Sequence, residues 1–543
     1  MSEARGPMRA ADILAARLYE AGCRHAFGMP GGEVLTVVDA LQRAGIRFVL
    51  AKHENAAGFM AEGMHHVDGA PGILVATLGP GAMNGVNVVA NAHQDRVPLI
   101  VITGCVDEDE ALSYTHQVLD HRAVFAPITK ASLRLTAAGA DIVADKALAI
   151  ATEGRSGPVH IDVPISVADQ LVTPDRQRRR VPGLVLAPAP SAGLAEARAW
   201  LVAARRPAMI LGLDALKDGA GAAALAFAES FGVPFVTSYK AKGLIDEDHP
   251  LCLGGAGLSP LADRHLLPLF RDADLVICAG YDPIEMRPGW REVWDPAATP
   301  VIDIAAEPNR HYMHQAGINI VADTGAALTA LAEGVTPAGA TWPGGEVAAA
   351  RAGLAAAFPR GDAWGAAAVI DECARVLPPE TLATVDSGAH RILLSQIWPC
   401  HRPRALLQSS GLCTMGCALP LAMGAQIADP ARPVVAFSGD AGFLMVAGEL
   451  STAAELGLRT IFVVFVDASL ALIEMKQRQR QMANAGVDFA RHDFAAIGRA
   501  FGGNGVRVTD RAGLRAALQA ALAAESFTVI AAEIDARSYD GRI

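Results

Sequence analysis

The sequence lacks the paired cysteines that zinc sites and disulfide frameworks use. Its eight cysteines are scattered and form no CxxC pair. Cys413 and Cys417 lie four residues apart, but no second pair and no clustered histidines accompany them, so we expect no zinc site there. Thiols distributed in this way are typical of reduced, mostly buried cysteines in a cytoplasmic protein.

The sequence also lacks the marks of a secreted, membrane or nucleic-acid-binding protein. Residues 1–5 do not lead into the apolar core of a signal peptide, and no uncharged apolar run reaches membrane-spanning length. The net charge of −11 argues against nucleic acid as a main partner. The basic run at residues 176–180 is too short to reverse that and predicts a solvated linker. We therefore expect a soluble, cytoplasmic protein with no nucleic-acid or membrane partner.

Charged residues are sparse, at 19% of the chain, whereas 52% of the residues are hydrophobic. This composition predicts a compact globular protein without a disordered region. A chain of 543 residues is too long for one hydrophobic core, so we expect about three domains.

Apolar strands alternate with helical segments in three successive blocks, which indicates parallel sheets covered by helices. The predicted fold class is α/β, with three doubly wound parallel-sheet domains at residues 1–175, 191–336 and 348–543. In the first block we expect helices at 10–21, 33–43 and 55–65 and a turn at 28–32. The predicted strands span residues 48–51, 72–78, 98–103, 208–211, 274–279, 300–304, 384–386, 405–408, 433–437, 460–466 and 527–533.

One stretch, residues 438–469, combines a small-residue turn with two acidic side chains. A strand at 433–437 leads into the turn at 438–442, and a helix at 443–457 precedes the strand at 460–466. Asp440 and Asp467 then follow neighbouring parallel strands, at one edge of the sheet. Backbone N–H groups beside two carboxylates suggest a divalent metal that bridges to a diphosphate. The alternative is an ordinary strand–turn–helix connection, which many α/β proteins have without a bound phosphate.

Glu54 directly follows a predicted strand and begins a largely apolar helix. It is either an exposed first-turn acid that complements the helix dipole or a desolvated acid with a raised pKa, suited to proton exchange with a ligand. Composition and spacing leave both alternatives open.

Several motifs together resemble one enzyme family. Gly439-Asp440-Ala441 followed by Val466-Asp467 is similar to the thiamine-diphosphate fingerprint, in which Gly-Asp-Gly precedes Asn-Asn at about this spacing. The chain departs from that fingerprint at Ala441 and at Val466-Asp467. Further segments resemble motifs of the acetolactate synthase group in their order along the chain; they are residues 28–32, 52–63, 78–85, 91–99, 114–120, 127–130 and 410–416. The chain is therefore identified as a member of the acetolactate synthase-like thiamine-diphosphate enzymes.

The resemblance implies two catalytic residues. Glu54 would hydrogen-bond the pyrimidine N1′ of thiamine and drive the amino–imino exchange that deprotonates C2. Gln117 would point toward the substrate-derived intermediate. In this family the glutamate and the metal site come from different subunits, so the resemblance implies a homo-oligomer with active sites at a dimer interface, and we expect a homotetramer.

The resemblance also implies the cofactor and metal ligands. Met415 would wedge beneath the bent cofactor, and the Cys413 carbonyl would accept a hydrogen bond from its 4′-amino group. Mg²⁺ would be bound by Asp440, Asp467 and the Ser469 carbonyl. The complete set of expected cofactor-binding residues is Pro30, Asn84, Gly388, Ala389, His390, Cys413, Met415, Gly439, Asp440, Ala441, Gly442, Asp467, Ser469 and Leu470.

The implied reaction joins two pyruvate molecules to 2-acetolactate and CO₂ through a C2 carbanion and an enamine. Residues 279–285 resemble the flavin-free branch, and Gly254–Gly257 is a weak dinucleotide motif, so we expect no FAD. Residues 388–391 and 474–478 differ from the flavin-containing synthases, which leaves other activities open. These are 2-oxo acid decarboxylation, hydroxy-ketone lysis and sulfoacetaldehyde acetyl transfer, and a non-catalytic binding relative is the alternative of another class.

Asp467 adds a negative charge beside an anionic diphosphate, where the family fingerprint has Asn. Coulomb repulsion should weaken cofactor binding unless the metal ion or a nearby donor compensates. We therefore predict that Asp467→Asn keeps activity and binds the cofactor at least as tightly.

Overall fold

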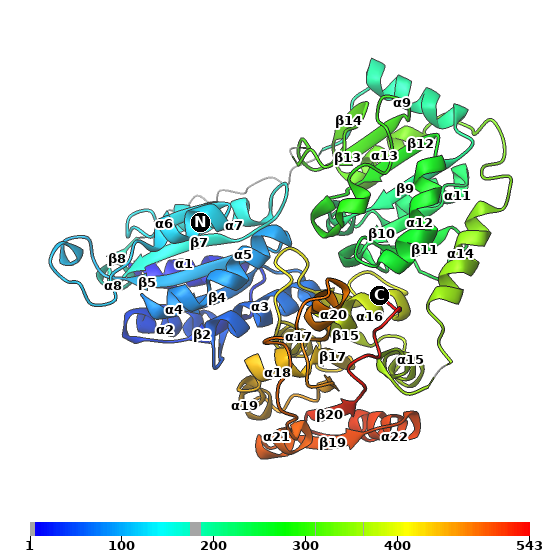
Figure 1. Ribbon diagram of the computed structural model, residues 1–543. Helices are drawn as coiled ribbons and strands as arrows, with labels where there is room; N and C mark the ends of the chain where they lie inside the picture. Colours follow the sequence, from blue (N-terminus) through cyan, green and yellow to red (C-terminus); the bar gives the residue numbers. More distant parts are fainter. Residues whose placement is uncertain (1–5, 174–185, 310, 362) are drawn as a thin grey trace.

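Three six-stranded parallel sheets make up the chain (Figure 1). The structure is a computed structural model that describes residues 6–173, 186–309, 311–361 and 363–543. Helices flank each sheet, so the predicted α/β class with three parallel-sheet domains is confirmed. The basic run at 176–180 lies outside the described residues, and the exact domain boundaries stay a prediction. Within the described residues, no helix is long and apolar enough to cross a membrane.

The N-terminal sheet has the strand order β3-β2-β4-β5-β7-β6. The predicted turn at 28–32 is partly wrong, because its first two residues end β2, a central strand. Gly28 permits this, since a Cβ there would lie 1.9 Å from the carbonyl oxygen of Val75 on β4. The strands are β2 (His25–Met29), β3 (Arg47–Leu50), β4 (Gly72–Ala76), β5 (Leu99–Cys105), β6 (Ala131–Arg134) and β7 (Val159–Pro164); the helices are α1 (Ala10–Glu20), α2 (Leu35–Ala44), α3 (Glu54–Asp68), α4 (Pro80–Asn84), α5 (Val86–Gln94), α6 (His121–Phe125), α7 (Ala140–Thr152) and α8 (Ile165–Asp169), and β1 (Met8–Arg9) pairs with β8 (Leu171–Val172).

The central sheet has the order β11-β10-β9-β12-β13-β14. The segment between this domain and the next is not a free linker, because Trp342 is buried and its Nε1 donates to the carbonyl oxygen of Pro207 at 2.8 Å. The elements are α9 (Ala192–Ala203), β9 (Pro207–Leu211), α10 (Leu213–Lys217), α11 (Gly221–Phe231), β10 (Phe235–Ser238), β11 (Cys252–Ala256), α12 (Pro260–Asp272), β12 (Leu275–Ala279), β13 (Val301–Ala305), β14 (Ile318–Val321), α13 (Thr324–Ala332) and α14 (Glu346–Ala357).

The C-terminal sheet has the order β16-β15-β17-β18-β20-β19. The single helix predicted at 443–457 is wrong: helix α18 begins at Asp440, and a break at Ala447–Gly448 separates it from α19. The Glu449 carboxylate accepts from the backbone N–H of Lys52 at 2.9 Å, a contact that local sequence does not show. The elements are α15 (Ala366–Val376), β15 (Leu382–Val385), α16 (Ala389–Ile397), β16 (Leu406–Gln408), α17 (Ala418–Ala428), β17 (Val434–Gly439), α18 (Asp440–Val446), α19 (Glu449–Glu455), β18 (Ile461–Val466), α20 (Ala471–Gln479), α21 (Phe494–Ala500), β19 (Asn504–Val508), α22 (Arg511–Leu522) and β20 (Thr528–Glu533).

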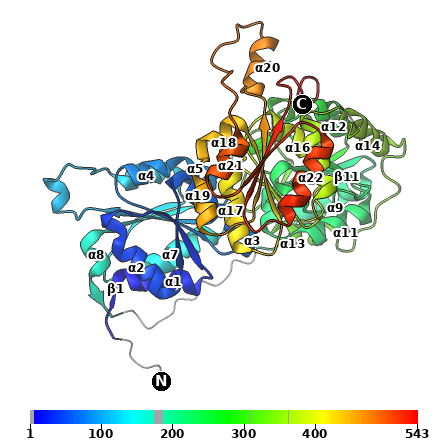
Figure 2. The same cartoon turned by 90° about the horizontal axis from the view of Figure 1, so that it is seen from below.

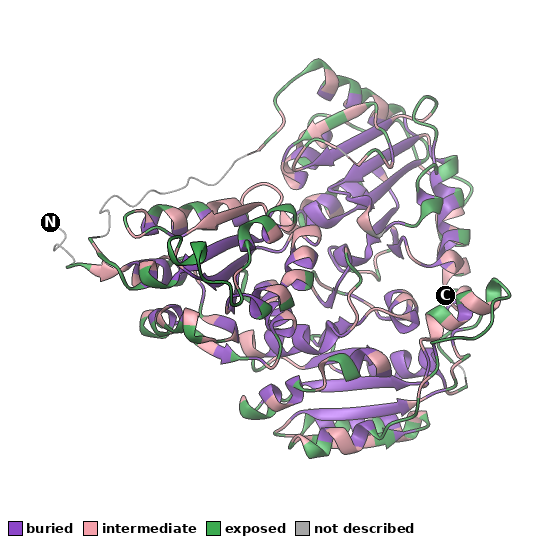
Figure 3. Ribbon diagram, turned by 60° about the vertical axis from the view of Figure 1, so that its left-hand side comes forward, coloured by how far each residue is buried: buried purple, intermediate pink, exposed green. Residues whose placement is uncertain are grey.

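Helices α3 and α17 join the N- and C-terminal domains. They cross closely because each has a glycine at the contact: a Cβ on Gly63 would lie 2.1 Å from the carbonyl oxygen of Leu421, and one on Gly424 would lie 1.9 Å from that of Met60. One hydrophobic cluster includes side chains from both domains, and a second joins the central and C-terminal domains. Figure 3 shows the resulting burial of the strands in all three sheets.

Candidate cofactor site

A cavity of ≈ 210 Å³ opens at the carboxyl edge of the C-terminal sheet. It contains every cofactor-binding residue that we predicted in this domain, together with residues that we did not predict. Its outer wall includes the start of α20, which projects from the domain (Figure 2). The lining residues are Ser387, Gly388, Ala389, His390, Cys413, Met415, Gly439, Asp440, Ala441, Gly442, Phe465, Asp467, Ser469, Leu470, Ala471, Leu472, Ile473 and Tyr539.

Two neighbouring strands bring Asp440 and Asp467 together, as the sequence predicted. Strands β17 and β18 pair in parallel, and each acidic residue follows the carboxyl end of one of them. The Asp440 Oδ2 accepts from the backbone N–H groups of Asp467 at 3.2 Å and Ala468 at 2.7 Å. Its Oδ1 accepts from the N–H of Ala441 at 2.8 Å. The backbone of both strand ends therefore fixes the position of this carboxylate.

Both carboxylates are buried, with Asp440 only 1% and Asp467 only 8% exposed. Burial, and then the nearby Asp440, raise the pKa of Asp467 to about 7. Burial also raises the pKa of Asp440. Two acids at this proximity repel each other when both are ionised, and a divalent cation between them would relieve that repulsion. Hard carboxylate and carbonyl oxygens are the ligands that Mg²⁺ prefers, so these residues fit such an ion.

Asp386 is a buried acid that the sequence reasoning did not assign. Its Oδ2 accepts from the hydroxyl of Ser438 at 2.9 Å, and its Oδ1 accepts from the backbone N–H of Ser387 at 2.9 Å and of Cys417 at 3.3 Å. Burial raises its pKa to about 6. A Cβ on Gly442 would lie 1.9 Å from its Oδ2, so a larger residue there would displace this carboxylate. Asp386 thus ties three segments of the cavity wall together, and its place directly after a strand was the signal that could have identified it.

The turn that carries Cys413 and Met415 is held from two directions. Cys413 has left-handed backbone, with φ 51°, and its Sγ accepts from Nη1 of Arg391 at 3.1 Å. Asp95 of the N-terminal domain accepts from the backbone N–H of Ser410 at 3.0 Å and of Gly411 at 2.8 Å. The contacts of Arg391 and Asp95 were not predicted from the sequence, because they cross between elements and domains.

His390 lies against the same cavity. Its ring stacks on Phe465, with 5.3 Å between the centroids, and burial lowers the pKa of the imidazole to about 3. Among the described residues, its Nε2 has no hydrogen-bond partner. The ring is therefore neutral and has one nitrogen available for a ligand.

Glu54 is buried, with 4% exposure, so the alternative of an exposed first-turn acid is wrong. The amide of Asn84 donates to its Oε2 at 2.9 Å. Gly81 faces its other oxygen, since a Cβ there would lie 3.1 Å from Oε1. Neither Glu54 nor Asn84 lines the C-terminal cavity of its own chain, and the same is true of the exposed Pro30.

Gln117 also lies away from that cavity. It has left-handed backbone, with φ 59°, and lines a separate cavity of ≈ 320 Å³ in the N-terminal domain. Its backbone and Cβ lie close to Gly79, whose N–H donates to Nε2 of His121 at 3.1 Å. Gln117 therefore lies beside the turn that precedes α4, away from Asp440 and Asp467 of this chain.

All eight cysteines are unpaired, and all except Cys413 are buried, as the sequence predicted. The cavity in the C-terminal domain consequently has one exposed thiol at its rim.

Comparisons with known proteins identify the family to which this chain belongs. Three family profiles match in order: "Thiamine pyrophosphate enzyme, N-terminal TPP binding domain" at residues 8–124, its "central domain" at 194–331, and its "C-terminal TPP binding domain" at 386–532. The chain is 28% identical to an acetolactate synthase of Bacillus subtilis, over 97% of this chain and 93% of that protein. It is 32% identical to the acetolactate synthase isozyme 1 large subunit of Escherichia coli, over 97% and 94%.

A further relative has a different name. The chain is 32% identical to a probable 2-ketoarginine decarboxylase of Pseudomonas aeruginosa, over 91% of this chain and 88% of that protein. All three profiles and these near full-length similarities agree on one family. The chain therefore belongs to the thiamine pyrophosphate enzymes and is an acetolactate synthase-like, thiamine-diphosphate-dependent member of that family.

Proposed function

We propose that the protein is a Mg²⁺-dependent acetolactate synthase that joins two pyruvate molecules with loss of CO₂. The observation that supports this most directly is the cavity at the carboxyl edge of the C-terminal sheet. It combines two buried carboxylates, a small-residue turn and the Met415 turn in one space. The full-length similarity to acetolactate synthases supports the same reaction.

We assign these residues the roles that the sequence predicted for them. Gly439 to Gly442 would hold the diphosphate through backbone N–H groups, and Asp440, Asp467 and the carbonyl of Ser469 would hold Mg²⁺. Gly388, Ala389 and His390 would contact the diphosphate from the opposite wall, where Nε2 of His390 has no hydrogen-bond partner among the described residues. Thiamine diphosphate, when bound, supplies the carbon nucleophile that attacks the substrate carbonyl.

Glu54 would exchange a proton with the pyrimidine N1′ of the cofactor. Its hydrogen bond from Asn84 fixes one carboxylate oxygen and leaves the other toward Gly81. We propose that Asn84 orients this acid, and that Gln117 contacts the substrate. The side chains of Leu470, Leu472 and Ile473 line the cavity and would exclude water from the reacting carbon.

The active site would need two copies of the chain. Glu54 and Asn84 lie outside the C-terminal cavity of their own chain, so a second copy would bring its own pair to that cavity. Apolar side chains at or beside the cavity support a covering partner: Leu412 is 36%, Leu444 39%, Met445 62% and Ile473 44% exposed. We propose a homotetramer assembled from such dimers, which sedimentation velocity would test.

We further propose that catalysis needs no FAD. Gly254 and Gly255 lie within β11, whereas α12 begins only at Pro260, so this motif is not the tight strand-to-helix turn of a dinucleotide site. The absorption spectrum of the purified protein tests this directly. The cytoplasmic location stays a prediction from the sequence.

The test of the reaction is reconstitution with thiamine diphosphate, Mg²⁺ and pyruvate, followed by measurement of CO₂, acetolactate and acetaldehyde. Acetolactate with an equal amount of CO₂ is the expected result. Acetaldehyde without acetolactate would contradict a synthase and identify a 2-oxo acid decarboxylase, the second candidate, which the similarity to a probable 2-ketoarginine decarboxylase favours. No turnover of pyruvate would contradict both for this substrate and would lead to a panel of 2-oxo acids and acyloins.

A further inference from the structure

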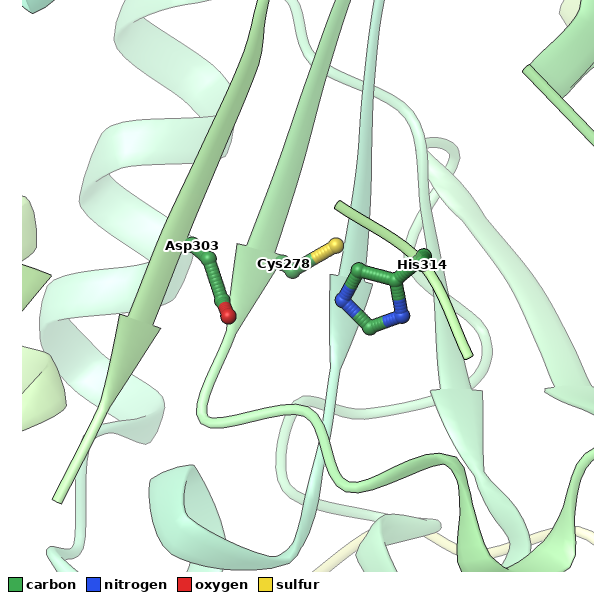
Figure 4. A group of neighbouring side chains, drawn as sticks. All are labelled: Cys278, Asp303 and His314. Carbon is green, nitrogen blue, oxygen red and sulfur yellow. The ribbon is translucent and has the colours of Figure 1, made fainter. Parts of the chain in front are cut away.

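A second group of chemically reactive side chains lies in the central domain, away from the cofactor cavity. Cys278 on β12 and Asp303 on β13 are paired across the parallel register of these strands. His314, from the segment that leads to β14, lies over them (Figure 4). One ligand atom from each of the three side chains lies within 4.8 Å of the other two.

This cluster is closed to solvent. The exposed fraction is 0% for Cys278, 3% for Asp303 and 6% for His314. Among the described residues, neither Oδ1 of Asp303 nor Nε2 of His314 has a hydrogen-bond partner. Figure 4 shows a ring nitrogen of His314 on the side that faces Cys278 and Asp303. Buried polar atoms without partners are costly, so two of them on one small group indicate that a ligand belongs there.

The second carboxylate oxygen of Asp303, Oδ2, already accepts a hydrogen bond, and this fixes the orientation of Oδ1. The side-chain amide of Asn309 donates to Asp303 Oδ2 at 3.0 Å. The His314 ring is fixed by its neighbours: it stacks on Tyr281 at 5.1 Å and meets the edge of Trp294 at 5.6 Å between centroids. These partners hold two of the ligand-bearing side chains in place, as supporting residues do around metal ligands.

The acidic side chains near Asp303 are paired with arginines and do not neutralise the cluster. Asp214 and Asp282, which lie near enough to Asp303 to raise its pKa, accept from Arg155 and Arg96 respectively. His311 contacts the His314 ring at 4.7 Å between centroids. Without a cation, burial raises the pKa of Asp303 to about 6, and burial and then His311 lower that of His314 to about 3. A thiolate, a carboxylate and a neutral imidazole would instead carry two negative charges, which one divalent cation neutralises.

We propose that Cys278, Asp303 and His314 bind a zinc ion that fastens the 311–317 segment onto strands β12 and β13. Sulfur, imidazole nitrogen and carboxylate oxygen are the three ligand types of protein zinc sites, at bond lengths of about 2.0–2.3 Å. Tetrahedral ligands at those lengths lie about 3.3–3.8 Å apart, within the spacing of this group. A water molecule enclosed in the cluster would supply the fourth ligand, and Cys278 would release its thiol proton when the ion binds.

No zinc pattern is visible in the sequence, because short-range cysteine pairs are absent. These three ligands are instead 25 and 11 residues apart in the sequence and meet through strand pairing and a return loop. The site is independent of the cofactor site and can be tested without thiamine diphosphate.

The test is metal analysis of the untagged full-length protein, after dialysis against a weak chelator and readdition of Zn²⁺. We expect one zinc ion per chain, retained in the presence of Mg²⁺. Substituting Co²⁺ should give an intense visible spectrum of a tetrahedral site with a thiolate-to-cobalt charge-transfer band. Absence of zinc together with absence of that band in the wild-type protein would overturn the proposal, whatever the variants do.

Matched variants locate the ion. Cys278→Ser and His314→Gln should each abolish the charge-transfer band or lower Co²⁺ affinity at least tenfold. Cys252→Ser changes another buried thiol of the same sheet and should keep the full band. A band that survives in Cys278→Ser, or that Cys252→Ser removes equally, would show that the ion is bound elsewhere.

Discussion

Substituting Asp467 by Asn tests the electrostatics of the proposed metal site. Burial and the nearby Asp440 raise the pKa of Asp467 to about 7 in the ion-free protein. An acid with a raised pKa is protonated below that value, and its proton must leave before the carboxylate can coordinate a cation. Wild-type affinity for Mg²⁺ and thiamine diphosphate should therefore fall as pH decreases through 7. The asparagine variant has no such proton to release.

The size of the effect follows from the pKa. At about one pH unit below the pKa, roughly one carboxylate in eleven is ionised, so affinity drops about tenfold between pH 8 and pH 6. Titrating both proteins with thiamine diphosphate at one fixed Mg²⁺ concentration, low enough not to saturate the cofactor-free protein, and following tryptophan fluorescence, gives the ratio of their affinities at each pH. Protonation of the cofactor itself cancels in this ratio.

We expect Asp467→Asn to bind at least as tightly as wild type at pH 8, and its relative affinity to rise about tenfold at pH 6. A ratio that does not change with pH would show that Asp467 is ionised throughout and that burial does not control it. A large loss of affinity in the variant at pH 8 would show that the carboxylate itself is needed.

Three further substitutions test how the site is positioned. Gly63→Ala places a Cβ 2.1 Å from a carbonyl oxygen of α17. We therefore expect the free energy of unfolding to fall by about 2 kcal/mol or more, with a lower melting temperature. The control Gly193→Ala, with no atom within 4 Å of its Cβ, should keep the wild-type melting temperature. Asn84→Ala frees Glu54 and should lower kcat about tenfold or more with cofactor affinity kept. Cys413→Gly removes a left-handed non-glycine residue but keeps the carbonyl, so turnover should stay within about twofold. Equal melting temperatures for Gly63→Ala and Gly193→Ala, loss of cofactor binding in Asn84→Ala, or loss of turnover in Cys413→Gly would contradict these assignments.

Local sequence predicted the parts of the site that lie at strand ends. Asp440 and Asp467 each follow a continuous apolar strand, and parallel pairing of such strands brings their ends together. The same logic applied to Asp386 after β15, where the sequence reasoning named the segment but not the residue. A strand end therefore indicates where an acid lies, but not how many contacts it makes.

Contacts between elements and between domains could not be predicted from patterns in the local sequence. The break between α18 and α19 accompanies the contact of Glu449 with Lys52, and Asp95 and Arg391 contact the Cys413 turn. Strand β2 was partly missed because Gly28 reads as a turn signal, although it serves a close approach to β4. Helical periodicity and turn propensity depend on residues that are close in sequence. The helix break, the Cys413 turn and strand β2 depend instead on residues that are close only in space.

We proposed an active site shared by two chains, with Glu54 from one and Asp440 from the other. Co-expressing a Glu54→Gln chain with an Asp440→Ala chain, each inactive alone, produces mixed dimers in which one of the two sites has both native residues. If chains associate at random, about half of the dimers are mixed, so CO₂ release from the 2-oxo acid that wild type uses should recover to about a quarter of the wild-type rate. No recovery in mixed dimers isolated with two different tags would contradict the shared site, and full activity of Glu54→Gln alone would contradict its role in catalysis.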